Sequence, residues 1–346
     1  MRIFSYRNKR TLRRIALIAL LAAVLLGLLI LARISYLGRY VVYSPDGVYF
    51  DKTQKLQRTP QTVPDTSNAE EYPFETILSA ASEETDIDPN AVQLQGFYIS
   101  TTMLANGVDE VRQALADADG YNAVLIDVKS PLGNFYYSTD IADTQTADAD
   151  IDACDALIKE LTETPDLIVI ARVPTFSDPN FVSKHYSSAL TTRSGDLWMD
   201  ERRCYWMRPD SIDAQSYLAA IALELDALGF DEVLFDNFYV PDDSSIVWDT
   251  EAITQVAALE TCAENLQANL TGSSIRLALG TEVSSVAQYA SRVFITTEKA
   301  NDVTRITQEM TDVLSNPSTQ LVFITTSHDT RFDSSGLIRP LMGEES

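Results

Sequence analysis

Residues 212–238, IDAQSYLAAIALELDALGFDEVLFDNF, contain the two patterns that decide the fold. The first part has a wide apolar stripe at helical spacing, made by Tyr217, Leu218, Ile221, Leu223, Leu225 and Leu228. The second part, EVLFDNF at 232–238, is a nearly continuous apolar run of strand length. An amphipathic helix beside such a strand indicates a buried parallel sheet that is covered by helices.

The same alternation continues on both sides of this segment. Further strands are expected at 96–100, 123–129, 167–173, 275–280, 292–297 and 320–326. Helical patterns lie near 108–118, 151–163, 213–228, 251–270, 283–290 and 300–315. Seven strand–helix units predict an α/β fold, a (β/α)8 TIM-type barrel over about residues 92–335.

The eighth strand is the weak point of this prediction. The chain is short after Thr326, and the apolar run Gly336-Leu337-Ile338 is brief. We therefore expect a barrel that is irregular or open at the eighth strand. The alternative is a doubly wound open sheet, but no G-x-G-x-x-G motif follows the first strand.

The amino-terminal region predicts a membrane anchor. Residues 15–32 form an unbroken run of 18 apolar or small residues, which as a helix would be about 27 Å long, close to the thickness of a bilayer core. Six basic residues precede the run: Arg2, Arg7, Lys9, Arg10, Arg13 and Arg14. We expect a cytoplasmic tail at 1–14, a signal-anchor at 15–34, and an extracellular carboxyl-terminal domain on a single-pass protein of the cell membrane. A cleaved signal peptide is the alternative.

Residues 35–91 are expected to link the anchor to the barrel domain at 92–346. The stretch VVYSPDGVYF predicts a short hairpin around Pro45-Asp46-Gly47. Residues 52–71 are polar and rich in Pro and Thr, which is typical of a stalk.

Composition excludes several classes of function. The chain of 346 residues carries 50 acidic and 26 basic residues, a net charge of −24, and such a body repels the phosphates of nucleic acids. Its two histidines, His185 and His328, and three widely spaced cysteines, Cys154, Cys204 and Cys262, form no metal-binding motif. We expect no metal, no cofactor and no nucleic-acid partner.

Charged residues at the predicted strand ends are the candidate site, because the carboxyl ends of barrel strands carry the chemistry. In chain order they are Asp127 and Lys129, Arg172, Asp236 and Asn237, Glu282, and Glu298. Two carboxylates that face one cavity are the equipment of a glycosidase. The alternative is structural, with Asp127 paired to Lys129 or Arg172 at the rim.

Aromatic residues gather in the same loops, including the long connection 174–209. They are Phe176, Tyr186, Trp198, Tyr205, Trp206, Phe238 and Tyr239. Aromatic rings can stack on sugar faces, and the alternative role is core packing. A connection of this length is usually functional.

Several motifs resemble DUF4015, a bacterial TIM-barrel family related to sugar hydrolases. They are GFYIS at 96–100, NAVLIDVK at 122–129 with Gly133, Ile170-Ala171-Arg172 with Phe176, Asp178 and Pro179, Leu197-Trp198 with Asp200, and GFDEVLFDNFYVP at 229–241. The resemblance spans residues 95–241. It implies a barrel of sugar-hydrolase ancestry in which Asp127 and Asp236 match the carboxylates of the second and fourth strands.

The chain departs from the family pattern at three positions within these motifs. Ser130 and Arg208 stand where the family has Asp, and Tyr239 stands where it has Arg. The later family motifs are not visible, and FITTE at 294–298 occupies the expected place of one of them.

Two functions remain in competition, with carbohydrate as the partner in both. The first is a membrane-anchored extracellular glycoside hydrolase that acts on a polysaccharide or cell-envelope glycan. Asp236 is then the nucleophile or electrostatic stabiliser, and Glu282 or Glu298 is the proton donor. Asp127 belongs to the same catalytic group, and substrate contacts come from Lys129, Arg172, Trp198, Trp206, Asn237 and Tyr239.

The second function is a non-catalytic barrel that binds glycans or serves as a surface scaffold. The three departures from the family pattern favour it. A metal-dependent hydrolase or deacetylase is disfavoured because the two histidines are isolated. A second carboxylate across an open groove from Asp236 would support the enzyme, whereas neighbours limited to Lys129 and Arg172 would support binding.

Overall fold

The computed structural model describes residues 41–44, 47–50, 92–142, 144–249 and 251–342. The chain divides into two compact units, Met1–Ser82 and Glu83–Ser346. The first unit contains an antiparallel pair of β1 (Val41–Ser44) and β2 (Gly47–Phe50), which agrees with the predicted hairpin, while Pro45 and Asp46 lie outside the described residues. The predicted cytoplasmic tail, the anchor at 15–34 and most of the stalk lie outside the described residues. Among the helices that are described, none combines the length and the apolar character needed to cross a bilayer.

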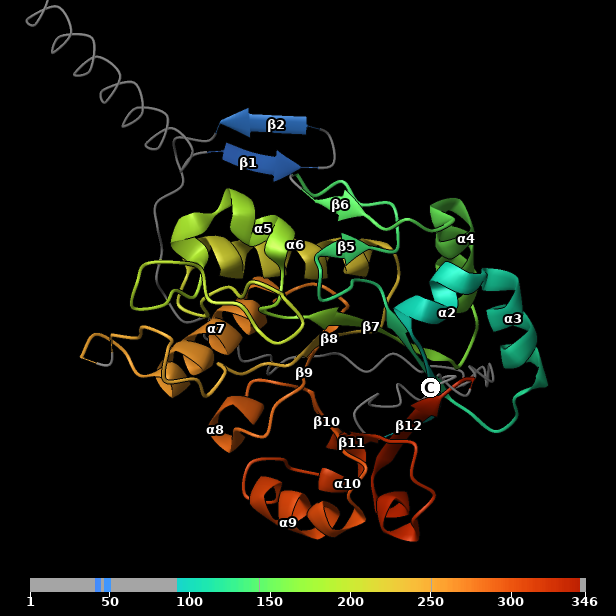
Figure 1. The fold of residues 1–346 in the computed structure, drawn as a ribbon. Helices are drawn as coiled ribbons and strands as arrows, with labels where there is room; N and C mark the ends of the chain where they lie inside the picture. The colour runs from blue at the N-terminus through green and yellow to red at the C-terminus, as the bar shows by residue number, and fades with distance from the viewer. Residues whose placement is uncertain (1–40, 45–46, 51–91, 143, 250, 343–346) are drawn as a thin grey trace, which may run out of the picture. The chain divides into compact units, whose positions relative to one another are not determined.

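The second unit is a closed barrel of eight strands (Figure 1). In chain order the strands are β3 (Gln95–Ile99), β4 (Ala123–Asp127), β7 (Ile168–Pro174), β8 (Glu232–Asp236), β9 (Arg276–Leu279), β10 (Arg292–Thr296), β11 (Leu321–Ile324) and β12 (Gly336–Pro340). Each strand pairs in parallel with its neighbours in this order, and β12 returns to β3. The predicted TIM-type barrel is confirmed.

The expectation of an irregular or open eighth strand was wrong. β12 pairs with β11 at Gly336 and with β3 at Leu337 and Ile338, so the barrel closes. The connection before β12 is short because one 3-10 turn, η3 (Thr330–Ser334), replaces a full helix. Its Phe332 is fully buried and packs edge-on against Phe323 of β11, with ring centroids 5.4 Å apart.

The helices follow the predicted order, and side-chain caps fix where several of them begin. The longer ones are α3 (Val108–Asp117), α4 (Ile151–Thr162), α6 (Ile212–Ala227), α7 (Gln255–Asn269) and α9 (Ala300–Met310). The shorter ones are α2 (Thr101–Asn106), α5 (Pro179–Lys184), η2 (Tyr186–Ser188), α8 (Ser284–Ala287) and α10 (Pro317–Gln320). At the start of α6, the Ser211 hydroxyl accepts a hydrogen bond from the Ala214 backbone N–H. The small pair β5 (Asn134–Phe135) and β6 (Gln145–Thr146) lies in the connection after β4.

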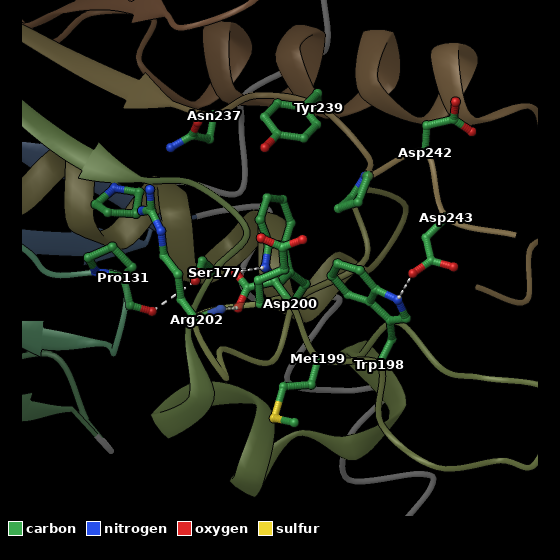
Figure 2. Close-up of a pocket in the computed structure, with 14 residues that line it drawn as sticks. Pro131, Ser177, Trp198, Met199, Asp200, Arg202, Asn237, Tyr239, Asp242 and Asp243 are labelled. Atoms are coloured by element: carbon green, nitrogen blue, oxygen red, sulfur yellow. Dashed lines mark hydrogen bonds between the residues drawn. The ribbon is translucent and has the colours of Figure 1, made fainter. Parts of the chain in front are cut away.

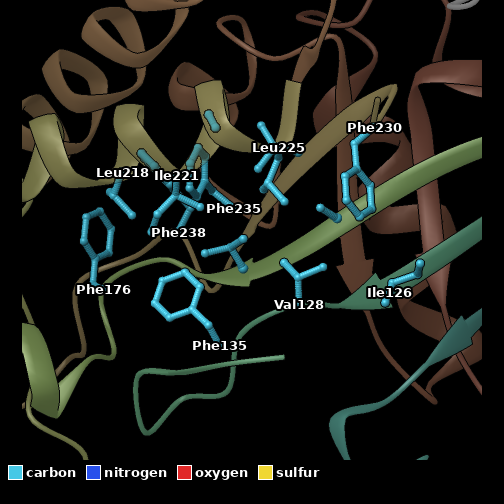
Figure 3. Packing of buried hydrophobic residues seen from close by; sticks show 14 of the residues in the cluster. Ile126, Val128, Phe135, Phe176, Leu218, Ile221, Leu225, Phe230, Phe235 and Phe238 are labelled. Atoms are coloured by element: carbon cyan, nitrogen blue, oxygen red, sulfur yellow. The ribbon is translucent and has the colours of Figure 1, made fainter. Parts of the chain in front are cut away.

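The core has two layers, one inside the barrel and one between the strands and the helices. The inner layer includes Leu125, Ile170 and Leu234, which belong to a cluster built almost wholly from strand residues. The outer layer packs the apolar face of α6 against β8, and Figure 3 shows Leu218, Ile221 and Leu225 close to Phe235. Burial on both faces explains why the strands read as continuous apolar runs.

Buried charges occupy the amino-terminal end of the barrel. Glu232, Arg276 and Arg292 begin β8, β9 and β10, and each lies two residues before an inner-layer position. Glu232 is fully buried, forms an ion pair with Arg292, and accepts a hydrogen bond of 2.7 Å from Arg276. Arg292 also donates to the Val92 backbone carbonyl at 3.0 Å. These buried charges therefore stabilise the barrel, and active sites of such barrels lie at the opposite, carboxyl-terminal end of the strands.

Candidate active site

Three charged side chains lie at interior-facing strand positions at the carboxyl-terminal end of the barrel. Asp127, Arg172 and Asp236 each follow an inner-layer residue by two positions, and side chains on one face of a strand recur every second residue. The register aligns Asp127 with Arg172 and places Asp236 beside Pro174 at the end of β7. The barrel thus brings three of the predicted site residues together at its mouth.

Asp127 and Arg172 form a bidentate ion pair. The Arg172 Nη2 atom lies 2.8 Å from Oδ2 of Asp127, and its Nε atom donates to Oδ1. The guanidinium carbon also lies 5.4 Å from the centroid of the Tyr98 ring. Burial lowers the pKa of Arg172, but the charge and hydrogen bonds of Asp127 outweigh it, and the pKa is raised. This is the pair that the structural alternative anticipated for Asp127.

Asp236 has a different environment, because no side-chain cation is hydrogen-bonded to it among the described residues. Its Oδ1 atom accepts the Asn237 backbone N–H at 2.9 Å. Burial raises the pKa of Asp236 above its usual value, and the nearby charge of Arg172 opposes that rise. The Asp127 charge raises the pKa further, so the two carboxylates and Arg172 influence one another.

The backbone around Asp236 is shaped to place its carboxylate. Asn237 has a φ of +55°, a left-handed conformation that Asn tolerates better than most residues. On the next strand, a Cβ atom at Gly280 would lie 2.5 Å from Oδ1 of Asp236 and 2.9 Å from its Cα. The carboxylate therefore occupies space that only glycine leaves open.

Lys129 lies away from the open site. Its side chain is fully buried and forms an ion pair of 2.9 Å with the equally buried Asp178. Asp178 also accepts hydrogen bonds from the Tyr217 hydroxyl at 2.9 Å and from the Phe181 backbone N–H at the start of α5. The Lys129 ammonium also donates to the Ser177 carbonyl at 3.3 Å. Lys129 therefore holds the loop after β7 in place through Asp178 and Ser177, and its buried charge is not accessible to a ligand.

The two candidate proton donors have different surroundings. Glu298 accepts hydrogen bonds from the hydroxyls of Thr325 and Thr326, and although burial raises its pKa, these bonds lower it below the usual value. Glu282 is more than half exposed and lies 3.2 Å from Arg305. Glu282 lines a cavity together with Asp236.

Of the seven predicted aromatic residues, Phe176 and Phe238 belong to the core, Tyr205 packs against it, and Tyr186 is 65% exposed. The other three, a buried pair and an exposed ring, line one cavity. Trp198 and Trp206 are almost buried, and their indole N–H groups donate to Asp243 and Asp200, each at 3.0 Å. Tyr239 is 43% exposed and packs against Trp206 with a centroid distance of 5.5 Å. Tyr239 is thus the ring best placed to stack on a sugar, and the tryptophans support it.

Two adjoining cavities are lined by residues of the candidate site. The first, about 460 Å³, lies beneath the loop after β7 and is lined by Trp198, Trp206, Asn237 and Tyr239 among others. Figure 2 shows Asn237 and Tyr239 on one side of it and Trp198, Met199 and Asp200 on the other. The second, about 300 Å³, is lined by Asp236, Gly280, Glu282 and Thr296 among others. Asn237 and Tyr239 line both.

Several lining residues escaped the sequence analysis. Arg202 lines the first cavity, and its charge acts on both Asp236 and Tyr239. Asp242 and Asp243 follow the fourth-strand motif directly and line the same cavity. Their position after a strand end was a usable signal, whereas the place of Arg202 depends on the folding of the long loop.

The described residues offer no cluster of three His, Cys, Asp or Glu side chains that could hold a metal ion. Cys154, Cys204 and Cys262 are all buried free thiols. Burial raises the pKa of Cys154 to about 11, which suits a core residue and not a nucleophile. The chemistry available at the mouth is therefore that of carboxylates, a guanidinium and aromatic rings.

Comparison with known protein families identifies the family to which this chain belongs. The model of DUF4015, described as "Putative glycosyl hydrolase domain", matches residues 96–318. No curated protein matches the chain.

Solved structures align with this chain at low sequence identity. TtGalA, an α-galactosidase from Thermus thermophilus in complex with p-nitrophenyl α-D-galactopyranoside, aligns with a TM-score of 0.52 and 12% identity over 72% of this chain and 58% of that one. A hypothetical protein from Ruminiclostridium thermocellum aligns with a TM-score of 0.45 and 22% identity over 52% of this chain and 96% of that one. The likeness to the α-galactosidase concerns the fold alone.

Proposed function

The chain belongs to the DUF4015 glycosyl hydrolase family, and from this premise we propose that it hydrolyses glycosidic bonds at the carboxyl-terminal mouth of the barrel. The observation that carries the proposal is the placement of Asp236. This inward-facing carboxylate ends the fourth strand and lines a cavity. Among the described residues, no cationic side chain is hydrogen-bonded to it.

In this proposal Asp236 acts at the anomeric carbon, either as the nucleophile or as a stabiliser of the positive charge that develops there. Arg172 favours the ionised form of Asp236, and Asp127 holds Arg172 in place through the bidentate pair. Asp127 is therefore a positioning residue and Arg172 an electrostatic one. Tyr239 and Asn237 contact the sugar because they line both cavities.

We assign the proton donor to Glu282 in preference to Glu298. Glu282 shares a cavity with Asp236, and a general acid must reach the glycosidic oxygen. The hydrogen bonds from Thr325 and Thr326 favour the ionised form of Glu298, which opposes a role as an acid. No cofactor enters this mechanism.

We also propose that the domain acts outside the cell on a polysaccharide or cell-envelope glycan. The support is the apolar run at 15–32 with six basic residues before it, which predicts a signal-anchor that keeps its amino end in the cytoplasm. The strongly acidic composition supports a substrate other than nucleic acid.

A second candidate, a glycan-binding protein without activity, is favoured by one specific observation. Three of the four predicted catalytic carboxylates already have side-chain partners: Asp127 pairs with Arg172, Glu298 accepts from Thr325 and Thr326, and Glu282 pairs with Arg305. If Glu282 does not serve as the acid, the cavities would bind a glycan without cleaving it.

The test is a hydrolysis screen with the full-length protein on a panel of cell-wall and environmental polysaccharides, read as release of reducing ends. Glu282→Gln and Glu298→Gln form a matched pair, since each removes one charge at nearly constant volume. We expect Glu282→Gln to lower the rate by about a hundredfold or more and Glu298→Gln to have a small effect. Glycan binding without any release of reducing ends would contradict the enzyme and support the second candidate.

A further inference from the structure

The two cavities lie on opposite sides of the residues that define the site. The cavity of about 300 Å³ contains Asp236 and extends over β9 and β10, toward Thr296. The cavity of about 460 Å³ extends the other way, beneath the loop after β7, toward Met199. Asn237 and Tyr239 lie between the two cavities, because they line both of them.

Each cavity has the size of a ligand site in its own right. Small-molecule pockets in proteins usually measure about 300–1,000 Å³. A site that accepts only the end of a sugar chain requires a wall beyond the reacting sugar, so that the chain cannot continue. Here space continues past Asn237 and Tyr239 in both directions.

The linings of both cavities suit sugars. Tyr239 offers a partly exposed ring to the first cavity and packs against Trp206, whose indole N–H donates to Asp200. The second cavity offers the hydroxyl of Thr296 and the carboxylate of Glu282. Ring faces and polar edges are the two surfaces that a pyranose presents, and each cavity has polar groups for the edges together with Tyr239, which lines both.

We propose that a glycan chain crosses the barrel mouth with sugars bound in both cavities, so that the enzyme cleaves internal bonds of a polysaccharide. The inference rests on the proposed function and specifies its substrate as the interior of a chain. The reaction is hydrolysis: the C–O bond between two sugars breaks, water supplies a hydroxyl to the anomeric carbon, and its remaining proton goes to the departing sugar oxygen.

Two blocking variants test this proposal, one in each cavity. Met199→Trp adds a large side chain to the first cavity from a residue that is 46% exposed, and Thr296→Trp does so in the second. Leu223→Trp, at an exposed position on α6 that lines neither cavity, is the matched control. Thermal melting verifies that all three variants fold.

The assay uses full-length protein and hexasaccharides of glucose, N-acetylglucosamine and glucosamine, each labelled at the reducing end. We expect labelled di-, tri- or tetrasaccharides as the products of the first turnovers, because removal of one sugar from either end gives only a labelled pentasaccharide or a labelled monosaccharide. We also expect a loss of about tenfold or more in kcat/KM for both blocking variants. The control variant should match the unmodified protein.

Each other result has a definite meaning. First products limited to the labelled pentasaccharide or the labelled monosaccharide, or loss of rate in only one of the two blocking variants, overturn internal cleavage and leave the proposed hydrolase in place. Absence of hydrolysis for all hexasaccharides and for the polysaccharide panel overturns the proposed hydrolase, and this inference with it.

Discussion

Asp236 is subject to two opposing influences, and these predict how activity depends on pH. Burial raises the pKa of its carboxyl and the Arg172 cation lowers it, with a net rise. If ionised Asp236 is required, hydrolysis falls as the pH drops through that pKa. Arg172→Met removes the opposing charge, so we expect the acidic limb of the kcat/KM profile to move to higher pH.

The control for that experiment is Arg112→Met, which removes a partly exposed guanidinium paired with Glu160 on the outer surface. Its profile should coincide with that of the unmodified protein. An acidic limb that stays in place or moves to lower pH in Arg172→Met would show that Arg172 does not act on the reacting carboxylate.

Two lysines with different surroundings test the role of the buried pair. The Lys129–Asp178 pair has no exposed side-chain surface, so Lys129→Met leaves an uncompensated buried carboxylate and should cost about 3–5 kcal/mol of unfolding free energy. Lys159→Met breaks an exposed pair with Glu163 and should cost less than about 1 kcal/mol. Urea unfolding measures both. Equal, small losses would contradict a structural role for Lys129.

At the scale of elements, the approach of β9 to β8 depends on Gly280. Its φ is not in the left-handed region, so replacement changes packing and not backbone preference. Gly280→Ala places a methyl group against the carboxylate and Cα of Asp236, and we expect about 1–3 kcal/mol of destabilisation together with a large loss of activity.

Gly272→Ala is the comparison, because a Cβ there meets no atom within 4 Å although its φ is +95°. It should lower stability through backbone strain and leave activity intact. Normal activity in Gly280→Ala would mean that the carboxylate does not act from the position described.

The strands and helices could be predicted where burial on both faces of the sheet requires an apolar sequence. β4, β7 and β8 are covered on both faces, so their apolar runs and the helices between them could be read directly. β12 was underestimated because its stability comes from pairing with β11 and β3, which a short sequence does not reveal.

The Asp127–Arg172 pair was among the alternatives that the sequence offered, whereas the partners of Lys129 and Glu298 were not predictable. The strand ends correctly indicated that Asp127, Arg172 and Asp236 meet, since inward positions recur every second residue. The burial of Lys129 depends on Asp178, which reaches it from a separate loop, and the hydrogen bonds of Glu298 depend on residues after β11. Such contacts arise between distant segments and leave no local pattern.

At the scale of the whole molecule, the acidic domain is expected to lie outside the cell, held by the anchor at 15–34. Protease added to intact cells should then digest residues 40–346 and leave a short membrane-bound fragment. Full protection of that region would contradict the orientation. A mature protein that begins just after Ala32 would contradict the anchor and indicate a cleaved signal peptide.

The central claim, that Asp236 is the reacting carboxylate of a glycoside hydrolase, is tested most directly by Asp236→Asn. Because the folded-state pKa of Asp236 is raised, the ionised side chain lowers stability above that pKa, and stability increases as the pH falls through it. The neutral amide removes that cost, and Arg172 keeps Asp127 as its partner. We therefore predict a melting temperature at neutral pH that is unchanged or raised, with hydrolysis reduced by several orders of magnitude. Hydrolysis at the unmodified rate in a normally folded variant would contradict the claim.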